Sequence, residues 1–291
     1  MRQISVFCRG FHRVAVWPLL AGIAVLAIAA PARAQTPSPL AEWQFSGGIQ
    51  LARLFEPTVP TWQTELGLAA QGSPLYDGAG RYQVRPGPVI DIRYKDIAFL
   101  STGEGLGANL FSFRHIRFGA AISYDLGRSP HVDGKALSGL GTIHPAPEIK
   151  IFADYTLAKA FPVDIRVDAR KQIGATYGYI GDVGAYMPMP GSSPSFVWFF
   201  GPTVTVADAR YMKGYFGISA RQAASTTYKQ YKADGGFKSA GVGISASWIL
   251  TPHVILNADG AFERLLGTAA DSPITDARYE GVASIAAIYK F

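Results

Sequence analysis

The sequence predicts an all-β protein, a transmembrane antiparallel β-barrel of about twelve strands in the outer membrane. Three observations predict it. The 291-residue chain opens on a leader typical of exported proteins. Polar and apolar residues then alternate over segments of about ten residues, the length at which a tilted strand crosses a bilayer. Finally, the chain ends on such an alternating segment, with an aromatic residue, Phe291, as its last residue.

Residues 1–34 form the leader. They have a basic start, an apolar run from Val14 to Ala30 and the small-residue ending Ala32-Arg33-Ala34. This pattern predicts a signal peptide cleaved near Ala34. The competing interpretation is an uncleaved anchor, which Pro18 inside the run disfavours. Because Cys8 is the only cysteine, the mature chain can form neither a disulfide nor a thiolate metal site.

Charge and hydropathy narrow the class of protein. The net charge is +6, but four of the 27 basic residues and none of the 21 acidic residues lie in the leader. The nearly balanced remainder excludes a nucleic-acid-binding protein. The longest apolar stretch after the leader, Phe196–Ala207, is too short for a membrane-spanning helix. An exported chain of this kind is a periplasmic or secreted β protein, or an outer-membrane barrel.

The alternation favours the barrel. In Pro162–Gln172, Val, Ile and Ala alternate with Asp and Arg, and similar patterns start at Ile116, Ile149 and Val254. A soluble sandwich alternates too, but it tolerates small residues within strands poorly. Aromatic residues near segment ends are typical of interfacial girdles. The tyrosines expected there are Tyr94, Tyr124, Tyr155, Tyr177, Tyr186, Tyr211, Tyr279 and Tyr289.

Twelve strands are predicted, an even number, as in single-chain bacterial barrels. They begin near Trp62, Tyr82, Ile97, His115, Pro147, Pro162, Tyr177, Phe196, Arg210, Phe237, Pro252 and Arg278. The chain is therefore divided into a signal peptide (1–34), a Pro-punctuated periplasmic tail (35–61) and the barrel (62–291). In the last strand, Tyr289 and Phe291 share a face and resemble the signal that the barrel assembly machinery reads.

One connection is unusual. With both chain ends in the periplasm, Ala220–Gly236 and Leu265–Ala277 become long outer loops, as is typical of such barrels. Leu126–His144 follows the predicted fourth strand and falls on the periplasmic side, where turns are short. Within it, Val132–Leu140 is expected to form a short helix. The long connection 126–144 is a predicted interaction surface, and the alternatives are a plain connector or a miscount by one strand.

Charged residues on the inward side of the strands are expected to line the lumen. They are Arg85, Asp91, Arg93, Glu148, Lys150, Asp154, Asp164, Arg166, Asp168, Arg170, Asp259 and Glu263. One interpretation is a weakly selective pore, because the signs are mixed. The other is a lumen filled by salt bridges, since charges kept away from lipid must pair or be hydrated.

The sequence shows no catalytic or metal-binding motif. The mature histidines, His115, His131, His144 and His253, show no recurring spacing with serine or acidic residues, and the chain has no G-x-S-x-G, H-E-x-x-H or P-loop motif. The sequence therefore predicts no catalytic residues, no metal site and no cofactor.

Several motifs along the chain are typical of one known family. They include Ser73-Pro74-x-Tyr76-x-Gly78, Arg85-Pro86-x-Pro88 and, further on, Gly127-Arg128 with Leu137-x-Gly139-Leu140-Gly141. The first two resemble the opening of the MipA/OmpV family of outer-membrane proteins, and the last pair is the most specific match. The closing Tyr289-Lys290-Phe291 fits as well. The resemblance covers the chain from about Trp62, with Ala79 where the family pattern suggests serine.

The resemblance implies a non-enzymatic outer-membrane protein. The family namesake is regarded as a scaffold that links a murein transglycosylase to a peptidoglycan synthase, and other members are described as porin-like proteins or adhesins. By this hypothesis, the partner-binding residues are Gly127, Arg128, Leu137, Gly139, Leu140 and Gly141. Outer-membrane lipids, lipopolysaccharide and the barrel assembly machinery are the other implied partners. A structural role for the glycines, a channel for small solutes and a surface adhesin stay open as alternatives.

Overall fold

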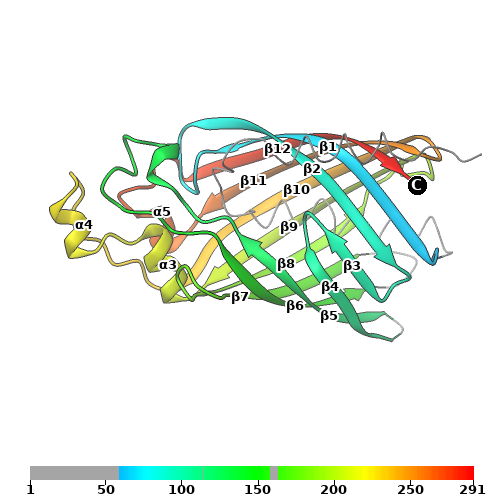
Figure 1. Ribbon diagram of the computed structural model, residues 1–291, viewed down its shortest axis with the longest axis horizontal. Coiled ribbons are helices and arrows are strands. Elements are labelled where there is room, and N and C mark those ends of the chain that lie inside the picture. The colour runs from blue at the N-terminus through cyan, green and yellow to red at the C-terminus, as the bar shows by residue number, and fades with distance from the viewer. Residues whose placement is uncertain (1–58, 114, 158–162) are drawn as a thin grey trace, which may run out of the picture. The chain divides into compact units, whose positions relative to one another are not determined.

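A computed structural model describes residues 59–113, 115–157 and 163–291, in which twelve antiparallel strands close into one barrel (Figure 1). Each strand pairs with its neighbours in sequence, and β1 closes the barrel against β12. The strands are β1 (Trp62–Pro74), β2 (Tyr82–Tyr94), β3 (Ala98–Ser101), β4 (Gly105–Phe113), β5 (Ile116–Asp125), β6 (Ala146–Thr156), β7 (Asp164–Gln172), β8 (Tyr179–Pro188), β9 (Phe196–Ala207), β10 (Gly236–Thr251), β11 (Val254–Leu265) and β12 (Tyr279–Lys290). The leader, its cleavage site and residues 35–58 of the tail lie outside the described residues.

The strands carry their apolar side chains on the outside. Val84 on β2 is 76% exposed and Ile285 on β12 is 66% exposed, whereas the alternate positions, such as Asp91 and Ser284, are buried. A water-soluble barrel has the opposite arrangement. A band of exposed Leu, Ile, Val and Phe around a polar interior is the arrangement that hydrocarbon requires. Among the described residues, no helix is long and apolar enough to cross a membrane.

The aromatic girdles are largely as expected. Tyr124, Tyr155, Tyr177, Tyr279 and Tyr289 are exposed on the outer surface. Two of the predicted girdle tyrosines are not there: Tyr186 is buried against other inward side chains of β8 and β9, and Tyr211 is buried in a helix. Both predictions were wrong because a tyrosine near a strand end can turn inward as well as outward.

The count of twelve strands is confirmed, but two of the predicted strands were wrong. The segment that begins near Ile97 is two short strands, β3 and β4, joined by a turn at residues 102–104. The segment near Arg210 is a helix, α3 (Ala209–Phe216), which Asp208 caps by accepting hydrogen bonds from the Arg210 and Tyr211 amides. One strand was missed and one was added, so the total was right.

These two errors reverse the direction that was assigned to every strand between them. As a result, connection 126–144 lies at the other end of the barrel. It follows β5 rather than a fourth strand, so it lies at the end of the barrel opposite to the start of β1 and the end of β12. The periplasmic placement was therefore wrong. We call this the loop end, because the long segments 208–235 and 266–278 lie there too. Long loops face the outside in outer-membrane barrels.

The loop end carries the other short helices, α4 (Ala220–Ala224), α5 (Gly267–Ala270) and the 3-10 turn Pro130–Val132. The helix predicted over Val132–Leu140 was wrong, since beyond this turn the segment forms turns and bends. At the opposite, terminal end, the Phe291 amide donates to the Thr64 carbonyl at 2.9 Å, and the Tyr289 and Phe291 rings meet edge to face. Recognition of these rings by the assembly machinery stays a prediction.

Candidate functional site

The charged residues predicted for the lumen occupy the inward positions of their strands. Ten of the twelve are buried, and the remaining two, Arg85 and Asp259, are partly buried. The buried members are Asp91, Arg93, Glu148, Lys150, Asp154, Asp164, Arg166, Asp168, Arg170 and Glu263. Because a buried charge is costly unless it is paired and hydrogen-bonded, the question is how these groups are matched.

A continuous chain of ion pairs crosses the lumen. Arg93 Nη2 lies 3.0 Å from one oxygen of Glu104, and Arg166 Nη2 lies 3.2 Å from the other. Arg166 also contacts Asp154 at 3.4 Å, and Arg117 contacts the second oxygen of Asp154 at 2.9 Å. The chain therefore runs from β2 through the β3–β4 turn to β7, β6 and β5. Each shared carboxylate has an arginine on each of its oxygens.

An aromatic side chain supports this chain of charges. The guanidinium of Arg166 lies 4.6 Å from the centroid of the Phe152 ring, and Arg117 and Lys150 approach the same ring at 6.0 and 5.9 Å. Cations close to an aromatic face are stabilised by the ring quadrupole. Phe152 is 1% exposed, so its ring fills space within the lumen.

A second group lies closer to the loop end. Arg170 contacts Asp168 at 3.3 Å and pairs with Asp182, which also accepts a hydrogen bond from Thr205. Beyond it, Lys238 lies 2.8 Å from Asp77 in the β1–β2 hairpin. These pairs indicate that charged side chains fill the lumen on the β5–β9 side and, near the loop end, extend to β10 and the β1–β2 hairpin.

The sequence prediction missed five members of these networks, namely Asp77, Glu104, Arg117, Asp182 and Lys238. Arg117 and Asp182 stand at alternating positions, so the period-two pattern was sufficient to find them. Glu104 was hidden inside a predicted strand that is in fact a turn.

The opposite side of the lumen carries smaller side chains toward the middle of the barrel. On β1, β10, β11 and β12 many inward residues there are glycine, alanine or serine, whereas Lys238, Glu263 and Glu280 are buried nearer the loop end. Examples are Gly67, Ala69, Gly241, Ser245, Ala261, Ser284 and Ala286. The filling of the lumen is therefore asymmetric.

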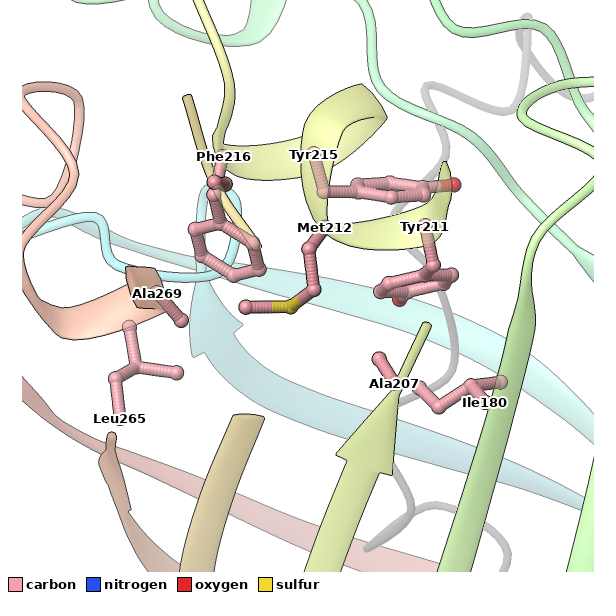
Figure 2. Packing of buried hydrophobic residues seen from close by; sticks show 9 residues of the cluster. Ile180, Ala207, Tyr211, Met212, Tyr215, Phe216, Leu265 and Ala269 are labelled. Atoms are coloured by element: carbon pink, nitrogen blue, oxygen red, sulfur yellow. The ribbon is translucent and has the colours of Figure 1, made fainter. Parts of the chain in front are cut away.

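Helix α3 lies at the loop end of the barrel, where its buried side chains pack with neighbouring residues (Figure 2). Its buried face presents Tyr211, Met212 and Phe216, which pack with residues at the outer ends of β8, β9 and β11. On its other side, the Tyr215 hydroxyl donates to Asp125 of β5 at 2.7 Å. The helix thus makes contacts on both sides of the barrel mouth. Together with the segments packed on it, we call it the cap.

Connection 126–144 belongs to the cap. Arg128 is buried, pairs with Ile143 as an isolated bridge and donates from Nη1 to the Tyr215 carbonyl. Burial lowers the pKa of its guanidinium. Further along, Leu137 and Leu140 pack with Tyr76 of the β1–β2 hairpin and with Ile218 and Ile274. Leu140 also accepts a hydrogen bond from Gln222 in α4.

The six residues of the predicted partner site are thus gathered at the loop end, within the cap. Gly127, Gly139 and Gly141 all have a left-handed backbone, with φ of 72°, 78° and 78°. Partner binding by the six residues stays a prediction, but only a partner at the loop end could meet them. The left-handed geometry supports the structural role that the sequence left open.

Gly127 offers a direct test of that structural role. A Cβ at this position would lie 2.1 Å from the Ile143 carbonyl oxygen, and φ would be strained in any L-residue. We expect Gly127→Ala to destabilise the folded barrel by about 1–3 kcal/mol, measured by denaturant unfolding in lipid vesicles. Gly141→Ala is the control, because it introduces a similar backbone strain without a close contact. No atom lies within 4 Å of its Cβ position. Equal losses in both variants would contradict a packing role for Gly127.

No group of three or more His, Cys, Asp and Glu residues within the described ranges is arranged to hold a metal ion. The arrangement is instead a lipid-facing barrel with a paired, filled lumen and a capped mouth, which defines an outer-membrane β-barrel protein. The chain matches the family described as MltA-interacting protein MipA over residues 66–291. It belongs to that family, as the sequence resemblance predicted.

The solved structures to which the chain is similar match it at low identity and low TM-score. The NanC porin is 10% identical, with a TM-score of 0.40 over 77% of this chain and 100% of that one. The CymD monoaromatic hydrocarbon channel is 10% identical, with a TM-score of 0.40 over 86% and 93%. The translocator domain of the autotransporter NalP from Neisseria meningitidis is 10% identical, with a TM-score of 0.40 over 83% and 93%. No protein with a curated description matches the chain.

Proposed function

We propose that this protein is a non-enzymatic outer-membrane anchor that holds murein-remodelling enzymes, a transglycosylase and a peptidoglycan synthase, at the inner face of the membrane. The observation that carries the proposal is the family match over residues 66–291, whose description names an interaction with MltA. The paired lumen and its cap support it, because an anchor needs a stable barrel and no open path through it.

The docking surface for these enzymes is at the terminal end, which faces the periplasm when long loops face outward. It is formed by the turns at 95–97, 189–195 and 252–253 and by the C-terminal Phe291. Residues 59–61, which immediately precede β1, lie at the same end because β1 begins there. Connection 126–144 lies at the other end and takes no part in this contact.

A pull-down with membrane-extracted protein tests the proposal. The bait is the folded full-length mature chain, and the probe is a purified murein transglycosylase of the same bacterium. We expect replacement of the 189–195 turn by a Gly-Ser turn to reduce capture, and replacement of 133–140 to leave capture unchanged. Capture lost only on replacement of 133–140, or no capture by the folded wild-type protein, would overturn the anchor role.

One observation favours a second function, a channel for small solutes. Toward the middle of β1 and β10–β12, glycine, alanine and serine at inward positions leave this side of the lumen with fewer long side chains than the β5–β9 side. Movement of the cap would then uncover a path along that side. Single-channel conductance in a planar bilayer separates this function from the anchor role, because an anchor requires no conductance.

A further inference from the structure

Strand β2 has a free edge along the half that faces the loop end. β3 pairs only with Asp91–Tyr94, and the last hydrogen bond on this side runs from the Thr102 amide to the Ile90 carbonyl at 2.9 Å. β3 and β4 then turn back at residues 102–104, far below the outer end of β2. The next strand that continues toward the loop end, β5, is separated from β2 by the two short strands. Between β2 and β5 the hydrogen-bonded wall is therefore interrupted toward the loop end.

Two prolines of β2 are consistent with an unpaired strand edge. In an antiparallel strand, the N–H and C=O of one residue point to the same side, and alternate residues point to the same neighbour. Ile90 points toward the interruption, so residues 88, 86 and 84 do as well. Pro86 and Pro88 have no N–H, and proline within sheets is confined to edges of this kind. The sequence has removed two of the donors that a partner strand would need.

The free edge is consequently rich in acceptors. The carbonyl groups of Val84, Pro86 and Pro88 point toward the interruption, and no hydrogen bond between described residues reaches them. A carbonyl group in the hydrocarbon region must find a donor. A strand from a second copy cannot supply a regular ladder here, so the donors come from smaller groups such as hydroxyls or amides.

A cation belongs to the same stretch of β2 as these carbonyl groups. Arg85 is on the inward face of β2, and its Nη2 is buried without a hydrogen-bond partner. Next to it, Gly87 faces inward with open space, because a Cβ there would meet no atom within 4 Å. On the outward face, Val84 is 76% exposed to the lipid side. Carbonyl acceptors, an unused cationic donor, free space and an apolar surface are thus found along five consecutive residues, 84–88.

We propose that this interruption, bounded by β2 residues 82–90 and the β3–β4 turn, binds a phosphorylated glycolipid from the outer leaflet. The sugar hydroxyl and amide groups donate to the carbonyl groups of β2. A phosphate of the headgroup accepts from Arg85, and the acyl chains lie against the apolar outer face around Val84. The site is independent of the anchor role, since it lies at the opposite end of the barrel.

Native mass spectrometry of the folded protein in detergent tests the proposal, with lipid A as the probe. We expect one saturable lipid A per barrel, with weaker binding of dephosphorylated lipid A and of phosphatidylglycerol. Arg85→Gln should weaken lipid A binding by about tenfold or more, the effect of losing a charge-assisted hydrogen bond. Gly87→Leu should block binding by filling the open space.

The matched control is Arg264→Gln, which removes one positive charge from the outward face of β11 near the same rim. It should bind lipid A as the wild type does, and heat-modifiable mobility on gels verifies that each variant is folded. Equal binding by Arg85→Gln and wild type, an equal loss in Arg264→Gln, or equal binding of phosphatidylglycerol would overturn the proposal.

Discussion

Replacement of α3 by a flexible linker should convert a silent barrel into a conducting one. The helix connects Asp125 on β5 with the outer ends of β8, β9 and β11, so it lies across the mouth. Without it, the inward residues in the middle of the β10–β12 side are mostly glycine, alanine and serine, and the buried Lys238, Glu263 and Glu280 remain near the loop end. We expect current steps in a planar bilayer that grow with salt concentration, where the wild type shows none.

Helix α4 provides the control for this experiment. It lies in the same connection, but it has no buried residues, so replacement of Ala220–Ala224 should leave the barrel silent. A folded barrel that stays silent without α3 would contradict the prediction. It would mean that the ion pairs of the lumen are a sufficient barrier, and the channel alternative would then be rejected.

The inward or outward direction of the strand side chains could be predicted from the sequence because it depends on a local pattern. Alternation places each side chain inside or outside, and this pattern located most strands and all twelve predicted lumen charges. The sequence also contains signals for the turn and for the helix that the prediction missed. Gly103 and Gly105 flank Glu104 at the missed turn, and Asp208 stands three residues before the helical spacing of Tyr211, Met212, Tyr215 and Phe216.

The cap could not be predicted in this way. Its defining contacts join residues far apart in sequence, such as Arg128 with Tyr215 and Leu137 with Tyr76. No local period encodes such pairs. A single missed turn also inverted the strands that followed, which moved connection 126–144 to the wrong end. In a barrel, the side on which a loop lies depends on the parity of the strand count, so one boundary decides the environment of distant residues.

Removal of Arg166 should cause the largest loss of stability among single substitutions in the lumen. This side chain joins Glu104 to Asp154 and lies over the Phe152 ring. In Arg166→Ala, both carboxylates lose a partner while they stay buried. Breaking a buried ion pair from one side costs about 3–5 kcal/mol, and we expect a loss of this size in denaturant unfolding measured in lipid vesicles.

Two further variants show whether the loss comes from unpaired charge. Lys232→Ala removes an exposed partner of Asp234 and should have no measurable effect, as is typical of surface pairs. Adding Glu104→Gln to Arg166→Ala should recover part of the stability, because one uncompensated carboxylate is removed. A loss below about 1 kcal/mol in Arg166→Ala would mean that water reaches these carboxylates. The lumen would then be hydrated rather than filled, which would favour the channel over the anchor.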